Sequence, residues 1–407
     1  MSACASISRA PQCRRRPSSG IPESRKSKAW IWIGLAAVCL GSAAATGHAG
    51  NAPVETIRVA PLADALTFAR VSRDGSLHTL AVTRYEHGEV DAVDLTSLLE
   101  RPDADAIELF REHGYDRIRD VVAAADGSAR IIVPAHRLLA PIDLGDRHVA
   151  AGTNFPEHAG EADVDDGPFL FAKLVAPTAP YAEVSTRGGL LDYEVEIGFV
   201  ALEAIAEGES PDWMGLVLCN DYTDRETLLE HIDVWNVASG KGFTTGKSFP
   251  GFLPIGNLFL IPRDYTGFAG RLELRLYVNG ELRQRATVRE AVWDLGELLA
   301  QTWARRATTW EHRGEQVGLL DAHGRIPARS LILGGTPSGT IFRGIGLSHR
   351  IAGLSKWLFG GWSRPLAEHV VEDYVGTPQV REAYLAAGDR VTARAEYLGV
   401  IDNEIRR

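Results

Sequence analysis

The stretch LDYEVEIGFV, residues 191–200, alternates apolar and polar side chains in the way that a β-strand requires. One face of such a strand carries Leu191, Tyr193, Val195, Ile197 and Phe199. The opposite face carries Asp192, Glu194, Glu196 and Gly198. Residues i and i+2 on a strand lie roughly 7 Å apart and point the same way. The stretch therefore predicts one continuous strand with an apolar face and two carboxylates side by side on the other.

Two such carboxylates have two interpretations. With Asp221, from GLVLCNDYTDRE (residues 215–226), they would offer three oxygen ligands to Mg²⁺ or Mn²⁺. The other interpretation is an acidic strand face in contact with water, which the E-x-E pattern alone would favour. Gly198 on the acidic side indicates close packing there and argues for the buried site.

A histidine and a glutamate lie three residues apart in AGTNFPEHAGEAD, residues 151–163. On a helical turn, His158 and Glu161 share a face and can hydrogen-bond. An imidazole held by a carboxylate is a typical general base for activating water. The same spacing is also common in surface pairs.

Two later loops contain further candidates. In KGFTTGKSFPGFLPIGN, residues 241–257, Lys241 and Lys247 could stabilise an oxyanion or bind a carboxylate, or could be ordinary surface lysines. In GGTPSG, residues 334–339, Thr336 lies on a glycine-rich turn after a predicted strand. Such a turn can bind an anion through its backbone N–H groups, or can be a turn and no more.

Taken in order, these motifs are more specific than any one of them. NFPEHAGE, FAKL, LDYEVEIGFV, CNDYTDRE, KSFPGFLPIG and GGTPSG together resemble the fumarylacetoacetate hydrolase family. The resemblance covers residues from about 138 to 341 and continues in AAGDRVTARAEYLGVIDNEI, residues 386–405.

The resemblance implies an α+β, mostly β fold of the family's own type, a mixed β-sandwich roll that forms a homodimer. It implies a divalent metal, Mg²⁺ or Mn²⁺. It also assigns roles to residues of this chain: metal ligands Glu194, Glu196 and Asp221; catalytic residues His158, Glu161 and Lys247; substrate-binding residues Thr336, Arg225 and Lys241, with Lys241 a rival to Lys247.

The activity that the resemblance implies is a hydrolase that cleaves a carbon–carbon bond in a β-diketo acid, such as an acylpyruvate or a fumarylacetoacetate-like acid. The same site would support an oxaloacetate-type decarboxylase or a keto-acid isomerase. A catalytically silent, exported protein that binds keto acids is the competing class. The expected partner is in each case a small keto or diketo acid.

The charge distribution separates the N-terminus from the rest of the chain. The net charge is −10, yet residues 1–49 hold seven basic residues and one acid, which leaves −16 on the remainder. An acidic body of this kind excludes nucleic-acid binding through neutralised phosphates.

The N-terminus itself has the pattern of an export signal. Basic residues are followed by an uncharged apolar run, AWIWIGLAAVCLGSAAA (residues 29–45), and then by the small residues of GHAG. We expect an exported, periplasmic protein, with an uncleaved membrane anchor or a misassigned start and a cytoplasmic product as alternatives. Membrane contact is expected only through this segment, if it is uncleaved. Cys219 is then the single cysteine of the mature chain and reads as a small buried hydrophobe.

The remaining chain is predicted as two domains. Residues 50–140 read as a small α/β domain, with a hairpin at Asp74-Gly75 and two short helices within residues 103–125. Residues 141–407 form the catalytic domain, with a hairpin at Asn279-Gly280 and a helix over about 289–313. An insertion at about 342–380 contains SKWLFGGW and could pack internally, cap the pocket, form an interface or lie on a membrane.

Overall fold

The structure is a computed structural model that describes residues 57–161, 167–233 and 235–407. The chain divides into two units, Met1–His48 and Ala49–Arg407. The predicted export segment therefore lies outside the described residues, and the description below concerns the second unit. Within the described ranges, every helix is too short or too polar to span a bilayer.

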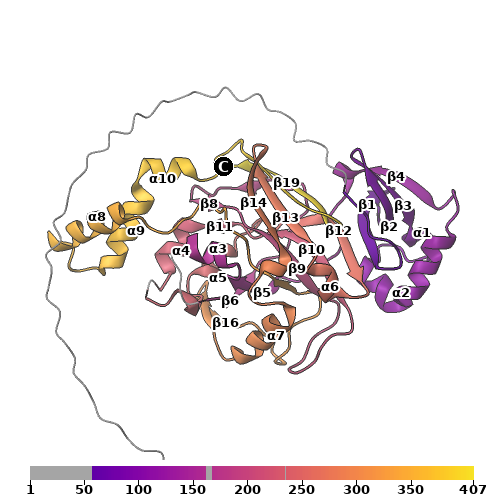
Figure 1. Cartoon of the computed structure of the whole chain (residues 1–407), viewed down its shortest axis with the longest axis horizontal. Coiled ribbons are helices and arrows are strands. Elements are labelled where there is room, and N and C mark those ends of the chain that lie inside the picture. Colours follow the sequence, from indigo (N-terminus) through magenta and orange to yellow (C-terminus); the bar gives the residue numbers. More distant parts are fainter. Residues whose placement is uncertain (1–56, 162–166, 234) are drawn as a thin grey trace, which may run out of the picture. The chain divides into compact units, whose positions relative to one another are not determined.

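The largest element of the fold is a sheet of ten strands, which runs from the N-terminal strands to the centre of the unit (Figure 1). In sheet order its strands are β4 (Arg130–Pro134), β3 (Glu89–Asp94), β2 (Ser76–Glu86), β1 (Ala65–Arg73), β12 (Ile255–Pro262), β10 (Met214–Asn220), β9 (Val195–Ala201), β17 (Leu331–Leu333), β5 (Arg147–Gly152) and β6 (Phe169–Leu174). Strand β17 is parallel to β5, while the other neighbours are antiparallel.

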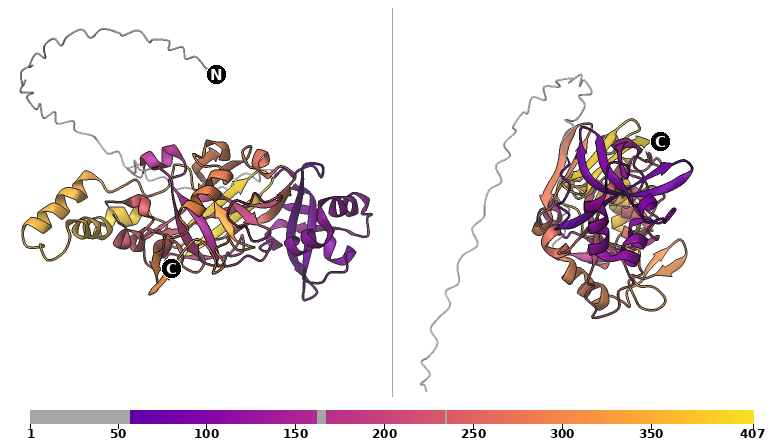
Figure 2. Two further views of the ribbon diagram at one scale, coloured as in Figure 1. Left: turned by 90° about the horizontal axis from the view of Figure 1, so that it is seen from below. Right: turned by 90° about the vertical axis from the view of Figure 1, so that its right-hand side faces the viewer.

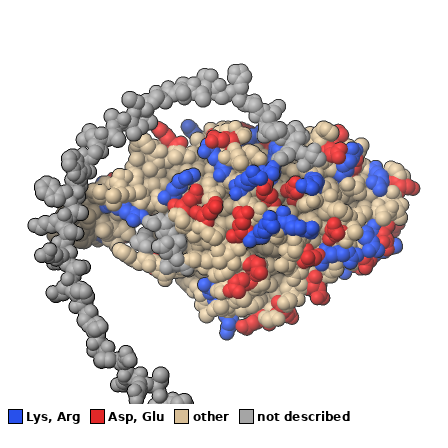
Figure 3. All heavy atoms as spheres, viewed as in Figure 1, with Lys and Arg blue, Asp and Glu red and all other residues tan. Residues whose placement is uncertain are grey.

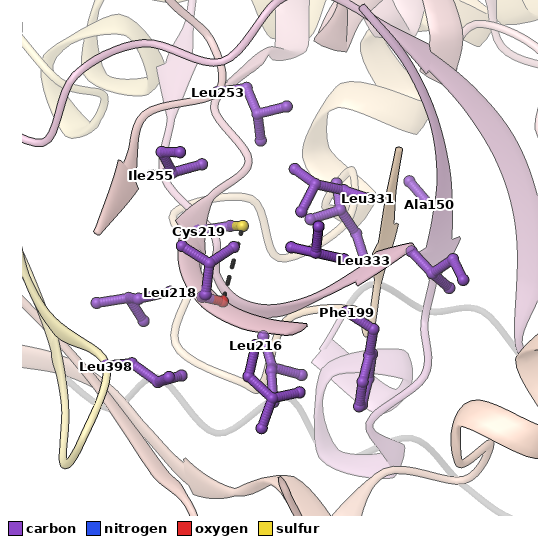
Figure 4. Packing of buried hydrophobic residues seen from close by; sticks show 14 of the residues in the cluster. Ala150, Phe199, Leu216, Leu218, Cys219, Leu253, Ile255, Leu331, Leu333 and Leu398 are labelled. Atoms are coloured by element: carbon purple, nitrogen blue, oxygen red, sulfur yellow. Dashed lines mark hydrogen bonds between the residues drawn. The ribbon is translucent and has the colours of Figure 1, made fainter. Parts of the chain in front are cut away.

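The central strands are buried on both faces. Every residue of β9, β10 and β12 is buried, because strands of a second sheet and helix α6 (Tyr265–Ala269) pack against them. Cys219 of β10 lies among leucine and phenylalanine side chains (Figure 4), so the prediction that it is a small buried hydrophobe is confirmed. Gly198 of β9 has no room for a side chain, since a Cβ there would lie 2.7 Å from Cys219 Sγ.

The second sheet has five strands: β14 (Glu281–Thr287), β13 (Glu273–Val278), β18 (Arg390–Ala395), β19 (Gly399–Arg406) and β7 (Val184–Ser185). The described residues also form two two-stranded sheets. One pairs β8 (Leu191–Asp192) with β11 (Thr223–Asp224), and the other pairs β15 (Trp310–His312) with β16 (Glu315–Val317). The α+β, mostly β class is confirmed.

Both predicted hairpins are present. The turn residues Asp74 and Gly75 have φ values of 51° and 87°, and Asn279 and Gly280 have 52° and 84°. Positive φ at both central residues is the geometry of the two-residue turn that matches the twist of antiparallel strands. Each turn joins adjacent strands, β1 to β2 and β13 to β14.

Three predicted elements differ from the structure. The single strand over 191–200 is wrong: it is divided into β8 and β9, with Tyr193 and Glu194 between them. The two short helices of the N-terminal region are one element, α2 (Ala106–Ala124), broken inside by Gly114 at φ 71° and ψ 169°. The helix over 289–313 is shortened to α7 (Leu295–Ala304), because Asp294 caps its N-terminus by accepting a hydrogen bond from the Glu297 N–H.

The N-terminal strands continue into the main sheet, because β1 pairs with β12 as well as with β2. The helices beside them are α1 (Leu95–Leu98) and α2. A separate domain over 50–140 and a boundary near Pro141 stay predictions. The other short helices that border the site are α3 (Pro156–Glu161), α4 (Arg225–His231), α5 (Phe243–Lys247) and α6 (Tyr265–Ala269).

The segment predicted as an insertion, residues 342–380, contains helices α8 (Leu347–Leu358) and α9 (Leu366–Gly376), and α10 (Pro378–Ala383) continues past its end; its status as an insertion stays a prediction. Helices α8 and α9 lie side by side (Figures 1 and 2). Both ends of the insertion are fixed at β8: the backbone N–H groups of Ile341 and Phe342 donate to the Asp192 carboxylate, and the Leu385 N–H donates to the Leu191 carbonyl.

We predict that Gly198→Val destabilises the protein by roughly 1–3 kcal/mol, because the added side chain must displace Cys219 and Leu331 in a close-packed sheet. Gly127→Ala is the matched control, since nothing lies within 4 Å of a Cβ at that exposed position. Urea unfolding followed by circular dichroism measures both. Equal midpoints for Gly198→Val and the parent would contradict the close approach.

Candidate metal and catalytic site

Three carboxylates meet where the central strand β9 begins and its antiparallel neighbour β10 ends. Glu194 precedes β9, Glu196 lies within it, and Asp221 follows β10. One oxygen of each lies within 4.8 Å of the others, and all three side chains are buried. The structure thus brings Glu194, Glu196 and Asp221 together, as the sequence predicts.

The break in the strand lets side chains take over the backbone hydrogen bonds at this point. The Glu194 N–H donates to Asn220 Oδ1 at 2.9 Å, and the Val195 N–H donates to Gln284 Oε1 at 2.9 Å. The Asp221 N–H donates to the Glu194 carbonyl at 2.8 Å. These contacts fix the positions of the carboxylates relative to β10 and β14.

Two cationic side chains of the predicted set contact the carboxylates directly. Lys247 Nζ lies 2.6 Å from Glu194 Oε2 and 3.0 Å from Asp221 Oδ2. Arg225 bridges Asp192 at 2.9 Å and Glu194 at 2.5 Å. Burial alone would raise the pKa of Glu194, but Lys247 and Arg225 outweigh it and lower that pKa to about 2. Glu194 is therefore ionised.

Lys173 is a third cation, which the sequence analysis did not identify although it quoted the FAKL motif. It lies in β6 with no exposed side-chain surface, and its Nζ donates to Asp221 Oδ1 at 2.5 Å. The carbonyls of Lys247 and Phe252 accept from the same nitrogen at 2.5 and 3.0 Å. A lysine inside the apolar run FLFAKL was the available signal, since a fully buried lysine needs partners.

Glu196 has the least charge compensation of the three. Its Oε2 accepts a hydrogen bond from the Gly335 N–H at 2.9 Å. Burial and the neighbouring carboxylates of Asp221 and Glu194 raise its pKa well above the ordinary value. A buried cluster of oxygen ligands with excess negative charge fits a hard divalent cation such as Mg²⁺ or Mn²⁺. The cluster could hold a divalent metal through Glu194, Glu196 and Asp221.

His158 and Glu161 lie one turn apart on α3, as predicted. Among the described residues, the Glu161 carboxylate has other partners and does not hydrogen-bond to the His158 imidazole. His158 is buried, and its Nδ1 has no hydrogen-bond partner there. Glu161 accepts from the Gly339 N–H at 2.8 Å and lies 3.7 Å from Arg343. Burial lowers the pKa of His158, so its imidazole is neutral at neutral pH.

The backbone N–H groups of the glycine-rich turn bind two carboxylate side chains of the same chain. Its N–H groups at Gly335 and Gly339 donate to Glu196 and Glu161. Thr336 Oγ1 donates to the Val195 carbonyl at 3.1 Å and accepts from Gln284 at 2.9 Å. The turn thus positions both a predicted metal ligand and a predicted catalytic residue.

A cavity of about 580 Å³ reaches Glu194 of the carboxylate cluster, while Glu196 and Asp221 do not line it. Five of the predicted site residues line it: His158, Glu194, Arg225, Lys247 and Thr336. Lys241 is exposed and is not among the lining residues. The remaining wall is mainly apolar and includes Phe171, Leu228, Leu229, Phe243, Phe342, Ile345, Leu354, Val370 and Val371.

Comparison with known proteins assigns the chain that carries this site to a protein family. The model of the fumarylacetoacetate (FAA) hydrolase C-terminal domain matches residues 147–406, which contain the carboxylates, His158 and the glycine-rich turn. The chain belongs to the fumarylacetoacetate hydrolase family. It is a family member whose carboxylate cluster could bind a divalent metal.

Among curated relatives, an oxaloacetate tautomerase of Xenopus laevis mitochondria is 26% identical over 211 residues, 49% of this chain and 63% of the relative. A human mitochondrial oxaloacetate tautomerase is 25% identical over 276 residues, 66% of this chain and 68% of the relative. The matched region thus spans less than two thirds of the frog protein's own length.

Solved structures show the same fold. A fumarylacetoacetate hydrolase from Exiguobacterium antarcticum aligns with a TM-score of 0.52 at 19% identity, over 84% of this chain and 99% of that one. A probable 2-hydroxyhepta-2,4-diene-1,7-dioate isomerase from Mycobacterium abscessus aligns with a TM-score of 0.50 at 21% identity, over 84% and 98%. The predicted family fold is therefore confirmed.

We predict that Lys173→Met destabilises the protein by about 3–5 kcal/mol, because it leaves Asp221 buried without one of its two cationic partners. Lys241→Met is the matched control on an exposed lysine of a neighbouring loop. Thermal unfolding in EDTA measures both variants. Similar unfolding temperatures for the two variants would contradict a structural role for Lys173.

We also predict a pH dependence that belongs to Glu194. Its folded pKa of about 2 lies below the ordinary value of 4.5, so the stability it contributes is present above pH 4.5 and is lost as the pH falls toward 2. The difference in unfolding free energy between the parent and Glu194→Gln, both in EDTA, should accordingly shrink over this range. A difference that stays constant from pH 6 to pH 3 would contradict the assignment.

Proposed function

We propose that this family member is a divalent-metal-dependent hydrolase that cleaves a carbon–carbon bond in a β-diketo acid with an apolar acyl group. The observation that carries the proposal is the cavity, in which Glu194, His158 and Lys247 lie within a mainly apolar wall. An acylpyruvate would place its oxygens at the carboxylate end and its acyl group against that wall. Oxaloacetate, which is small and polar throughout, would leave the wall unused.

The proposed reaction needs a base, positive charge and a metal. A Mg²⁺ or Mn²⁺ ion held by Glu194, Glu196 and Asp221 would supply Lewis-acid polarisation of the carbonyl. His158 is neutral because of its burial, so it can accept a proton from water. The hydroxyl adds to the acyl carbon, the carbon–carbon bond breaks, and the released carbon takes a proton. The products are a carboxylic acid and a keto acid.

Two nearby groups support His158 in this proposal. Its buried Nδ1 lacks a partner within the described residues, and Glu161 is one helical turn away. If the Glu161 carboxylate exchanged the Gly339 N–H for the imidazole, it would orient His158 as a base. Lys247 and Arg225 place positive charge along the cavity, which favours an anionic substrate and an oxyanion.

A second candidate is tautomerisation of a keto acid, with decarboxylation a variant on the same site. The frog and human relatives described above carry the name oxaloacetate tautomerase, and moving one proton requires only a single neutral imidazole of the kind that His158 provides. A catalytically silent keto-acid-binding protein is the non-enzymatic alternative. We further propose an exported homodimer, which the N-terminal pattern and the family resemblance support.

We expect the Ala49–Arg407 unit with Mg²⁺ or Mn²⁺ to cleave acylpyruvates, and to cleave those with longer acyl groups better than acetylpyruvate. Loss of the diketone absorbance, with and without EDTA, measures this activity. His158→Asn should lower kcat by roughly 10²–10⁴-fold. His231→Asn, on an exposed histidine, is the matched control and should leave kcat unchanged.

Other outcomes assign the site differently. Consumption of oxaloacetate enol without diketone cleavage would replace the hydrolase by a tautomerase, and release of CO₂ would replace it by a decarboxylase. Thermal stabilisation by diketo acids without any product would indicate the binding protein. Full activity in EDTA would contradict the role of the metal.

A further inference from the structure

Helices α8 and α9, with the residues that precede them, form one side of the cavity. Apolar side chains from this part of the chain line it, among them Phe342, Ile345, Leu354, Ala367, Val370 and Val371. We call these six residues the α8–α9 wall. On the face of the molecule seen in Figure 3, acidic and basic side chains are interspersed over much of the surface, which contrasts with the apolar character of the wall. The reaction proposed above requires space for an acyl group, and these side chains bound that space on one side.

Helix α9 contributes one of its faces to the wall. Ala367, Val370 and Val371 recur at the spacing of a single helical face, and the buried Tyr374 continues that face by one more turn. Helix α9 packs against α4 and against α8. The contact with α8 is close, since a Cβ on Gly353 would lie 2.5 Å from Val370 Cγ2. Neighbouring helices therefore fix the position of the face that α9 presents to the cavity.

Phe342 lies at the boundary between the charged end of the cavity and the rest of the wall. Its N–H donates to Asp192 Oδ2 at 3.1 Å, and its ring centroid lies 5.3 Å from the guanidinium carbon of Arg225. Arg225 in turn pairs with Glu194 at 2.5 Å. On its other side, the Phe342 ring packs edge-on against Tyr374 of α9, with the centroids 6.1 Å apart. A ligand that binds its anionic group near Arg225 would therefore extend past Phe342 to reach α9.

Two residues of the α8–α9 wall are placed to limit the length of such a ligand. Val371 is 7% exposed and is the most buried of the six, whereas Leu354 is 40% exposed and is the least buried. Ala367 lies one turn before Val371 on the same face of α9 and has the smallest side chain of the six. A larger side chain at position 367 would take space from the far end of the ligand, and a smaller one at position 371 would add space there.

We propose that the α8–α9 wall selects substrates by the length of an aliphatic acyl chain, with Ala367 and Val371 as the residues that set the limit. The inference rests on the proposed function and adds the substrate class, acylpyruvates with a chain longer than acetyl. The cavity of about 580 Å³ lies within the range of about 300–1,000 Å³ that holds drug-sized ligands. Acetylpyruvate would occupy only the charged end of it. Each further methylene group buried against the wall should raise the affinity about threefold.

The test measures binding as a function of chain length, so it requires no turnover. The full-length protein with Mn²⁺ is titrated with pyruvate, 2-oxohexanoate, 2-oxooctanoate and 2-oxodecanoate, and thermal stabilisation gives each affinity. The affinity of the parent should rise with chain length. Ala367→Phe should lower the affinity for 2-oxooctanoate at least about tenfold, because the ring would displace two or more methylene groups from the wall. The affinity for pyruvate should stay within about twofold of the parent. Val371→Ala should raise the ratio of 2-oxodecanoate affinity to pyruvate affinity.

Glu368→Phe is the matched control, because it adds the same side chain at the next position of α9, which is exposed and is not among the residues that line the cavity. It should bind all four acids like the parent. Equal unfolding temperatures without ligand show that the variants are folded. A uniform loss of affinity for every acid in Ala367→Phe would overturn the proposal, as would a parent whose affinity does not depend on chain length.

Rates of acylpyruvate cleavage separate this inference from the proposed reaction. If acylpyruvates are cleaved, Ala367→Phe should lower kcat/KM for those with long chains and leave kcat/KM for acetylpyruvate unchanged. If none is cleaved, but longer 2-oxo acids bind the parent more tightly and lose that advantage in Ala367→Phe, the hydrolase proposal fails and the selection by chain length stands.

Discussion

The burial of four carboxylates in one place is the constraint on which the rest of the site depends. Asp192, Glu194, Glu196 and Asp221 are all buried, and removing ionised groups from water is strongly unfavourable unless opposite charges and hydrogen bonds compensate. Lys173, Lys247 and Arg225 supply three positive charges from three separate elements, β6, α5 and α4. The sheet and the short helices are therefore held together at the carboxylate cluster, which is also the proposed metal site.

The interruption between β8 and β9 shows how the backbone adapts to that constraint. A regular strand would use the N–H groups of Glu194 and Val195 in a ladder, but here the side chains of Asn220 and Gln284 accept them. Asn220 lies in β10 of the large sheet, and Gln284 lies in β14 of the five-stranded sheet. Both sheets therefore fix the positions of the carboxylates. The position of the carboxylate oxygens thus depends on the packing of one sheet on the other.

The sequence predicted the parts of the site that local periodicity and motif order control. The two-residue period placed Glu194 and Glu196 together, and the helical turn placed His158 near Glu161. It did not predict Lys173 as a partner of Asp221, or the Gly339 N–H as the partner of Glu161, because these contacts join segments far apart in the chain. The strand break and the later start of α7, at Leu295 instead of about residue 289, were missed for a related reason: the side chains of Asn220, Gln284 and Asp294 accept the backbone N–H groups at these points. The apolar wall of the cavity has no single signature, since many separate elements contribute to it.

The attachment of the α8–α10 insertion has an evolutionary consequence. The insertion leaves at Ile341 and returns at Leu385, and both ends are hydrogen-bonded to the two residues of β8. The entropy of closing such a loop changes slowly with its length, by about 0.6 kcal/mol for each doubling. Related sequences could therefore lengthen, shorten or replace this segment while the acidic cluster and its cations stay unchanged. Changes in this one segment would then alter the part of the cavity wall that Ile345, Leu354 and Val370 supply, while the buried ion pairs are unaffected.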